Sequence, residues 1–346
     1  MKKELLMASA LVSTLGAASV ANAVTATMSG AHMTALKGID TDAADAKITH
    51  DVSSDFSVSL SETTDGGIGI ATSFMLANEN AGLHTAGLTL TFTDGSKLDV
   101  IKAGNAAASH DVSIPGAAGN PGVSIVTTNN AQTGLDFFGE ATAIGVEWHS
   151  AADFMADGLK VSASISADDG IAAGATVALE SSWGLGATYV TSAGDTAITI
   201  GAGIADSEFK DNAQAVDGSN GFHVGFSAVT GDLTVAAGYA NGDKIRVTPE
   251  VAIFDNSVSS VGVKYVTGDV TLSAGYSSAE GDDNTSALTS AGGSNDTKDT
   301  TSLGISYAVA SGVTANIGWK DIDAQDDGAN DTSGGSSWYV GATMSF

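Results

Sequence analysis

The sequence predicts an all-β protein, a transmembrane antiparallel β-barrel of sixteen strands with short turns at one end and long loops at the other. Three observations predict this fold class. The chain ends in an alternating strand that finishes on an aromatic residue, and the same alternation recurs over most of the preceding sequence. After the N-terminal segment, no stretch approaches the ~18 uninterrupted apolar residues that a membrane-spanning helix requires.

The C-terminal strand, residues 336–346, has one continuous apolar face. Its members alternate with small and polar residues, as an amphipathic strand requires, and they are Trp338, Val340, Ala342, Met344 and Phe346. The last residues of a soluble domain usually fray, so a free aromatic end is unusual there. The strand resembles the assembly signal of Gram-negative outer-membrane barrels. A soluble β-sandwich is the alternative explanation of this strand taken alone.

The first 23 residues have the pattern of a secretory signal peptide. Lys2 and Lys3 precede an apolar run that ends at Val20, and Ala21-Asn22-Ala23 supplies a small-x-small cleavage site. Cleavage there would leave 323 of the 346 residues, and we predict that residues 24–346 form a single barrel domain. Export of the chain favours a barrel over a soluble fold.

The composition excludes several classes of protein. The chain has 43 Gly, 3 Pro and no Cys, so neither a proline-rich linker nor a disulfide framework is expected. Its formal charge of -27 excludes nucleic-acid binding, because no basic stripe exists to neutralise phosphates. The acidic residues lie mainly between the apolar runs and are expected to form solvated loops. We expect no cofactor, with weak binding of Ca²⁺ or Mg²⁺ between acidic loops as an open alternative.

Alternation places five strands before residue 104, at about 24–36, 47–61, 67–77, 85–93 and 97–103. Asp65-Gly66 and Asp94-Gly95 lie between neighbouring strands, and Asp and Gly favour tight hairpin turns. The alternation then fails from Gly104 to Gly139, where two of the prolines lie. A loop this long within a compact domain suggests a function.

Alternation resumes at residue 140 and continues to the C-terminus. The remaining strands begin near residues 140, 157, 174, 195, 221, 232, 256, 269, 300, 312 and 336. The sequence TGDLTVAAGY at 230–239 recurs as TGDVTLSAGY at 267–276, which predicts a repeated hairpin with a tight turn at its base. A propeller could also contain repeats, but each of its blades would show four strands.

Long and short connections between the predicted strands alternate along the chain. The predicted long connections are 37–46, 78–84, 104–139, 167–173, 206–220, 241–255, 279–299 and 321–335. Short periplasmic turns and long outer loops are typical of outer-membrane barrels. Aromatic residues at the strand ends predict two interfacial girdles: Tyr239, Tyr276, Trp319 and Trp338 near the loops, and Trp148, Tyr265, Tyr307 and Phe346 near the turns.

The chain resembles the Gram-negative general porins, particularly the alphaproteobacterial type. The resemblance rests on VTATMSG at 24–30, ETTDGGIGIATSF at 62–74 and the ending at 338–346. It implies a homotrimer of sixteen-stranded barrels in the outer membrane, with the third outer loop, here 104–139, folded into the lumen as a constriction. The clustered arginines of that family have no counterpart, because the one arginine, Arg246, lies in a predicted outer loop.

The sequence therefore predicts a passive, water-filled channel for small hydrophilic solutes and ions, with a weak preference for cations. Its predicted lumen and constriction residues are Asp99, Asp111, Pro115, Pro121, Asp136, Glu147, Lys160 and Lys264. By parity, His149, Lys97 and Lys320 also face inward. Membrane lipid, lipopolysaccharide and the barrel assembly machinery are the expected partners. The alternative is a structural or adhesive surface barrel with a closed lumen.

The sequence shows no motif for catalysis or metal binding. The histidines are dispersed, with no metal-ligand spacing, and they are His32, His50, His84, His110, His149 and His223. We therefore expect no enzyme and no metal site. Catalytic triads are assembled in space, however, so one sequence does not exclude them.

Overall fold

The computed structural model describes residues 24–41, 44–77, 84–85, 87–100, 106–116, 145–167, 177–211, 215–247, 251–281, 296–325 and 334–346. The predicted signal peptide, residues 1–23, lies outside the described residues. The described structure is almost entirely β, with one short 3-10 helix, η1 (Ala108–His110). No helix in this part of the chain is both long and apolar enough to cross a membrane.

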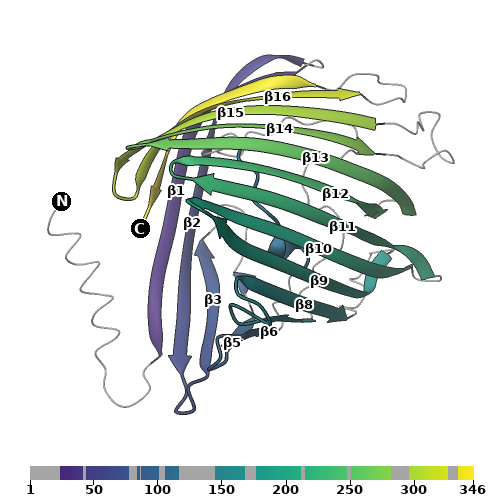
Figure 1. Cartoon of the computed structure of the whole chain (residues 1–346). Coiled ribbons are helices and arrows are strands. Elements are labelled where there is room, and N and C mark those ends of the chain that lie inside the picture. The colour runs from purple at the N-terminus through teal and green to yellow at the C-terminus, as the bar shows by residue number, and fades with distance from the viewer. Residues whose placement is uncertain are drawn as a thin grey trace.

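The strands form one closed antiparallel sheet (Figure 1). They are β1 (Thr25–Thr41), β2 (Ala44–Thr63), β3 (Gly69–Ala77), β4 (His84–Thr85), β5 (Leu88–Thr91), β6 (Lys97–Val100), β7 (Gly145–His149), β8 (Leu159–Ala167), β9 (Val177–Ala193), β10 (Thr196–Asp211), β11 (Ala215–Thr230), β12 (Leu233–Val247), β13 (Val251–Thr267), β14 (Val270–Gly281), β15 (Asp296–Ala310), β16 (Val313–Gln325) and β17 (Gly335–Ser345). Both β4 and β5 pair with β3, so these two segments occupy one position in the wall. The predicted sixteen-stranded barrel is confirmed.

The barrel closes where the last strand meets the first. β17 pairs with β1 from Gly335 opposite Thr41 to Ser345 opposite Ala31. Beyond this ladder, the backbones of Phe346 and Gly30 exchange two hydrogen bonds of 3.1 and 3.2 Å. The chain end therefore completes a sheet edge, which would otherwise carry unpaired backbone groups.

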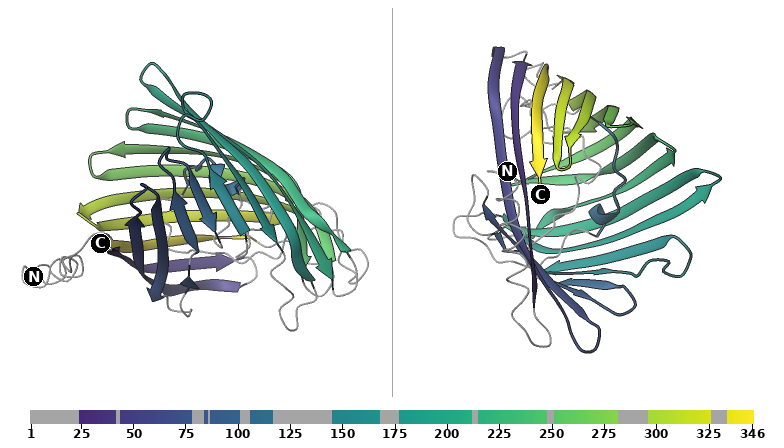
Figure 2. Two further views of the ribbon diagram at one scale, coloured as in Figure 1. Left: turned by 90° about the horizontal axis from the view of Figure 1, so that it is seen from below. Right: turned by 90° about the vertical axis from the view of Figure 1, so that its left-hand side faces the viewer.

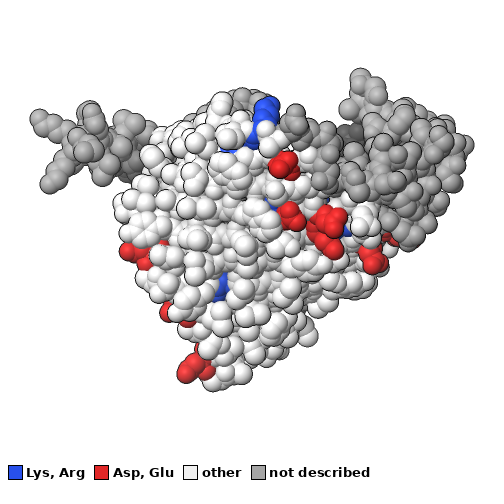
Figure 3. Space-filling view, turned by 90° about the horizontal axis from the view of Figure 1, so that it is seen from above, with Lys and Arg blue, Asp and Glu red and all other residues white. Residues whose placement is uncertain are grey.

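The wall is apolar outside and polar inside. On β17, the side chains of Trp338, Val340 and Met344 are 44%, 43% and 53% exposed, while Ser337 and Tyr339 on the other face are buried. Neighbouring strands repeat this arrangement, and Figure 3 shows an outer face that is largely uncharged, with acidic side chains toward its two ends. An apolar outer band is what a membrane-spanning barrel presents to lipid.

Tight turns join the strands at one end of the barrel. The repeated sequence forms the β11–β12 and β13–β14 hairpins, as predicted, with Gly231 and Gly268 at φ values of 54° and 57° in the two turns. In the β5–β6 turn, the Asp94 carboxylate accepts hydrogen bonds from the Ser96 hydroxyl at 2.7 Å and the Ser96 amide at 2.9 Å. These bonds lower the pKa of Asp94.

Several strands are longer than predicted. Only residues 42–43, 212–214 and 248–250 separate β1 from β2, β10 from β11 and β12 from β13, so the long outer loops predicted at 37–46, 206–220 and 241–255 are wrong. The backbone ladder continues past the amphipathic stretches because its hydrogen bonds do not depend on side-chain polarity.

Because the strands are longer than predicted, several charged residues lie in strands rather than in the predicted loops. Arg246 lies in β12 rather than in a loop. Acidic residues that the sequence analysis assigned to loops lie in β14, β15 and β16, and they are Glu280, Asp296, Asp299, Asp321 and Asp323.

Candidate functional site: the pore and its inner segment

Residues 106–116, which we call the inner segment, lie inside the barrel. Figures 1 and 2 show η1 within the ring of strands. The segment belongs to the predicted constriction loop at 104–139, of which residues 117–139 lie outside the described part. Pro121 and Asp136 are therefore not described, and a constriction formed by the whole loop stays a prediction.

The first half of the inner segment is tied to hydroxyl groups of β8 and β9. The amide of Ala106 donates to Ser164 Oγ at 2.9 Å. The ring of His110 lies between two hydroxyls, with Nδ1 2.7 Å from Thr188 Oγ1 and Nε2 2.8 Å from Ser162 Oγ. Burial lowers the pKa of His110 to about 4, and the nearby cationic groups reinforce the shift.

Glycines of the inner wall make room for this segment. A Cβ on Gly203 would lie 2.7 Å from Cα of Ala107, and one on Gly225 would lie 2.6 Å from Cβ of Val112. Four further glycines face the segment with equally little space, and they are Gly186, Gly201, Gly262 and Gly275. We call these six residues the glycine track. A side chain at any of them would force the inner segment away from the wall.

His223 of β11 holds the segment at two points. Its side chain is fully buried, and its Nε2 lies 2.8 Å from the carbonyl oxygen of Ala107. A carbonyl oxygen only accepts, so Nε2 carries a proton. Nδ1 lies 2.9 Å from Asp111 Oδ1, so a doubly protonated ring would pair with that carboxylate. The sequence analysis placed Asp111 in the lumen but did not identify His223 as its partner.

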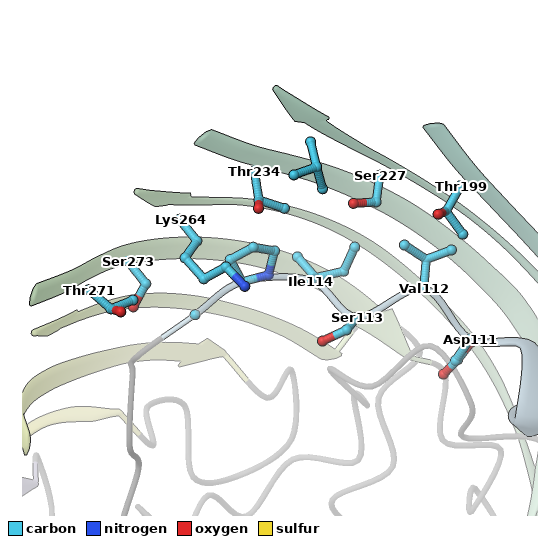
Figure 4. Close-up of a pocket in the computed structure, with 13 residues that line it drawn as sticks. Asp111, Val112, Ser113, Ile114, Thr199, Ser227, Thr234, Lys264, Thr271 and Ser273 are labelled. Atoms are coloured by element: carbon cyan, nitrogen blue, oxygen red, sulfur yellow. The ribbon is translucent and has the colours of Figure 1, made fainter. Parts of the chain in front are cut away.

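A hollow of about 490 Å³ lies beside the second half of the inner segment (Figure 4). The predicted lumen residues Asp111, Pro115 and Lys264 all line it. The opposite side is formed by polar wall residues, namely Thr199, Ser227, Thr234, Thr271 and Ser273. This lining is suited to water and hydrophilic solutes.

The predicted lumen residues Asp99 and Glu147 meet at a second place. They are directly opposite each other on β6 and β7. Nε2 of His149 lies 3.3 Å from Asp99 Oδ2 and 3.7 Å from Glu147 Oε1, and its Nδ1 lies 2.8 Å from Ser162 Oγ. Lys160 is exposed on the same inward-facing side of β8. The inner segment contacts this cluster at one point, where Ser109 Oγ donates to Glu147 Oε1 at 2.7 Å.

The chain matches a known family over almost its whole length. Residues 8–346 match the family model of the Gram-negative porins. The chain belongs to the Gram-negative porin family. No curated protein sequence matches this porin significantly.

Solved porin structures share the fold at low sequence identity. OmpF of Salmonella typhi, in complex with daunomycin, is 13% identical with a TM-score of 0.66, covering 93% of this porin and 97% of that chain. The outer membrane channel DcaP of Acinetobacter baumannii is 10% identical with a TM-score of 0.65 and the same coverage. OmpT of Vibrio cholerae, in its trimer form, is 17% identical with a TM-score of 0.61, covering 93% and 99%.

The predicted family, outer-membrane location and barrel fold are thus confirmed. The porin is a passive channel of the outer membrane. Family and fold point to a channel rather than an enzyme.

Proposed function

We propose that this porin passes small hydrophilic solutes and ions by diffusion, with a weak preference for cations. The supporting observation is the hollow between the inner segment and the wall of β10 to β14, whose wall side carries mainly hydroxyl side chains. Hydroxyl groups and Lys264 face this space, so water is the favoured content. A structural or adhesive barrel with a plugged lumen would not need such a lining.

The charge distribution supports only a weak selectivity. Loss of Lys2, Lys3 and Glu4 with the signal peptide would change the formal charge from -27 to -28. Many acidic residues lie near the outer ends of the strands, and screening limits their field to ~8 Å at physiological salt. On the inner wall, Lys97 and Lys160 share the inward face with Asp99 and Glu147, and Lys37 pairs with Asp51 at 2.9 Å.

Recordings in a planar bilayer test this proposal. We expect stepwise ohmic conductance and, across a gradient of dilute KCl, a reversal potential of the sign that indicates cation preference. That preference should fade as ionic strength rises. An anion-preferring reversal potential would refute the charge argument, whereas absence of conductance from well-folded protein would favour the plugged barrel.

The constriction assignment needs its own variant. Deletion of about ten residues around Pro115 to Pro121 should enlarge both the conductance and the solute size cutoff, because the inner segment occupies part of the lumen. Unchanged values would show that this loop does not narrow the pore, and the constriction assignment would then be wrong.

We also propose that the porin has no hydrolytic activity, although a carboxylate, an imidazole and a hydroxyl contact one another in the same succession as in a catalytic triad. Asp99, His149 and Ser162 form a chain of contacts of 3.3 and 2.8 Å. Ser162 is only 4% exposed, however, and His110 occupies the other side of its hydroxyl at 2.8 Å. A nucleophile must reach its substrate, and this hydroxyl is covered. Hydrolysis of esters that is lost in a Ser162→Ala variant would contradict this proposal.

A homotrimer is the assembly that the outer wall supports. His32 and Thr34 of β1 are exposed on the outward face, and His32 Nδ1 lies 2.8 Å from Ser54 Oγ of β2. Polar side chains are unfavourable against lipid, so we propose that a second copy covers this part of the wall. A Thr34→Trp variant should lose trimers in native mass spectrometry, whereas Ala274→Trp on distant β14 should retain them. Monomeric wild-type protein would contradict the assignment.

Lipopolysaccharide and the assembly machinery are the proposed envelope partners. Asp321 and Asp323 follow Trp319 on the outward face of β16, and Asp323 is opposite Asp299 of β15. Carboxylates beyond an aromatic girdle suit weak bridging by Ca²⁺ or Mg²⁺ to lipid phosphates. An Asp299→Asn/Asp323→Asn variant should bind less lipopolysaccharide in the presence of Mg²⁺, and unchanged binding would refute the bridge. The apolar terminal strand is the proposed signal for assembly.

A further inference from the structure

Three side chains with metal-ligating atoms meet on the inner wall of β6 and β7. The ligand atoms of Asp99, Glu147 and His149 all lie within 4.8 Å of one another. We propose that these residues bind one zinc ion in the lumen. The site goes beyond the channel function and does not depend on it.

The distances fit a tetrahedral ion closely. With Zn–N and Zn–O bonds of about 2.1 Å, the ligand atoms of such a site lie about 3.4 Å apart. His149 Nε2 is already 3.3 Å from Asp99 Oδ2 and 3.7 Å from Glu147 Oε1. Two of the three separations therefore need almost no adjustment, and the carboxylate oxygens lie within 4.8 Å of each other.

Hydroxyl groups fix the three ligands in place. Ser162 Oγ contacts Nδ1 of His149 at 2.8 Å, which leaves Nε2 directed at the carboxylates. Thr89 Oγ1 donates to Asp99 Oδ1, and Ser109 Oγ donates to Glu147 Oε1 at 2.7 Å. Outer partners of this kind orient metal ligands and increase affinity.

The two neighbouring carboxylates of Asp99 and Glu147 also favour a cation between them. Asp99 and Glu147 are direct cross-strand neighbours, and Glu147 is only 3% exposed. Like charges directly opposite each other destabilise a sheet, and burial of one of them adds to the cost. A divalent ion would offset both carboxylates.

The donor set selects zinc over the abundant hard cations. One imidazole nitrogen and two carboxylate oxygens suit Zn²⁺, whereas Mg²⁺ and Ca²⁺ prefer oxygen ligands alone. The side chains of His149 and Asp99 are 26% and 14% exposed. This access leaves room for an ion to enter from the lumen and for water to occupy a fourth position.

Calorimetric titration of the folded protein in detergent with ZnCl₂ tests the site. Excess Mg²⁺ in the buffer occupies weak carboxylate sites elsewhere. We expect one Zn²⁺ per chain, with an affinity that falls about tenfold or more in His149→Gln and in Asp99→Asn. His50→Gln removes an exposed histidine on the outward face and should bind as the wild type does.

Two further measurements keep the outcome clear. Heat-modifiable mobility in SDS shows whether each variant folds, and Asp99→Asn, which keeps the side-chain shape, serves as the test by itself if His149→Gln does not fold. Co²⁺ bound in place of zinc should give visible absorption bands that are lost in both ligand variants. If the wild type and His149→Gln titrate alike, or if Co²⁺ gives no such bands, the zinc site is refuted.

Discussion

Replacement of His223 by leucine should release the inner segment from the barrel wall. His223 contacts the segment at both the Ala107 carbonyl oxygen and the Asp111 carboxylate, although the segment lies more than 100 residues before it in the sequence. Leucine has a similar volume but no polar atom, so it removes both interactions without opening a large cavity. The buried carbonyl of Ala107 would also lose one of its donors.

The size of the effect follows from these two contacts. A net contribution of about 1 kcal/mol is expected for the neutral hydrogen bond, and about 2 kcal/mol for the contact with the Asp111 carboxylate when both ring nitrogens of His223 are protonated. Their sum of about 3 kcal/mol corresponds to roughly two powers of ten in the equilibrium between docked and released segment. The strands themselves keep their ladders, so the barrel should remain folded.

Hydrogen exchange followed by mass spectrometry measures this opening. The amides of His110 and Asp111 donate within the segment to the carbonyl oxygens of Ala107 and Ala108, each at 3.1 Å. In His223→Leu, a peptide covering residues 106–116 should exchange about one-hundredfold faster, because local opening controls its protection. His50→Leu, on the outward face, is the matched control. Equal exchange in wild type and His223→Leu would show that the two contacts do not hold the segment.

Three further predictions concern the track, the chain end and pH. Gly225→Val should displace Val112 and raise single-channel conductance, and unchanged conductance would mean that the glycine track does not seat the segment. Phe346→Ser should lower the amount of porin in the outer membrane, as quantified in membrane fractions, because a ring 6.3 Å from that of Phe56 at the closing edge is lost; normal amounts would contradict this. Because the pKa of His110 falls from 6.5 to about 4 on docking, the released segment binds a proton more readily. Docking should be fully stabilised above pH ~6.5, should lose up to ~1.4 kcal/mol per pH unit toward pH 4 and should lose no more below it. Exchange corrected for its intrinsic pH dependence measures this, and an opening free energy that is constant over that range would refute it.

The local pattern of the chain was sufficient to predict the wall. Side chains alternate across a strand, so polarity alone placed Trp338, Val340 and Met344 outside, and Asp-Gly or Gly turns marked the hairpins. The terminal Phe346 indicated a strand that needs a partner. The strand ends were less predictable, because ladder hydrogen bonds continue through polar sequence. The acidic residues of β14 to β16 were assigned to loops for this reason.

Only the closed barrel decided which inward residues meet. Parity assigns Asp99, Glu147 and His149 to one face, but the register of β6 with β7 brings their ligand atoms together. His223 lies 116 residues from Ala107, and no local signal links the two positions. The glycine track likewise draws its six residues from five strands, and each lacks a side chain because another part of the chain occupies that space. Alternation along a strand determines the face of each residue, whereas contacts across the lumen depend on register, closure and the path of the inner segment, which the tertiary structure alone defines.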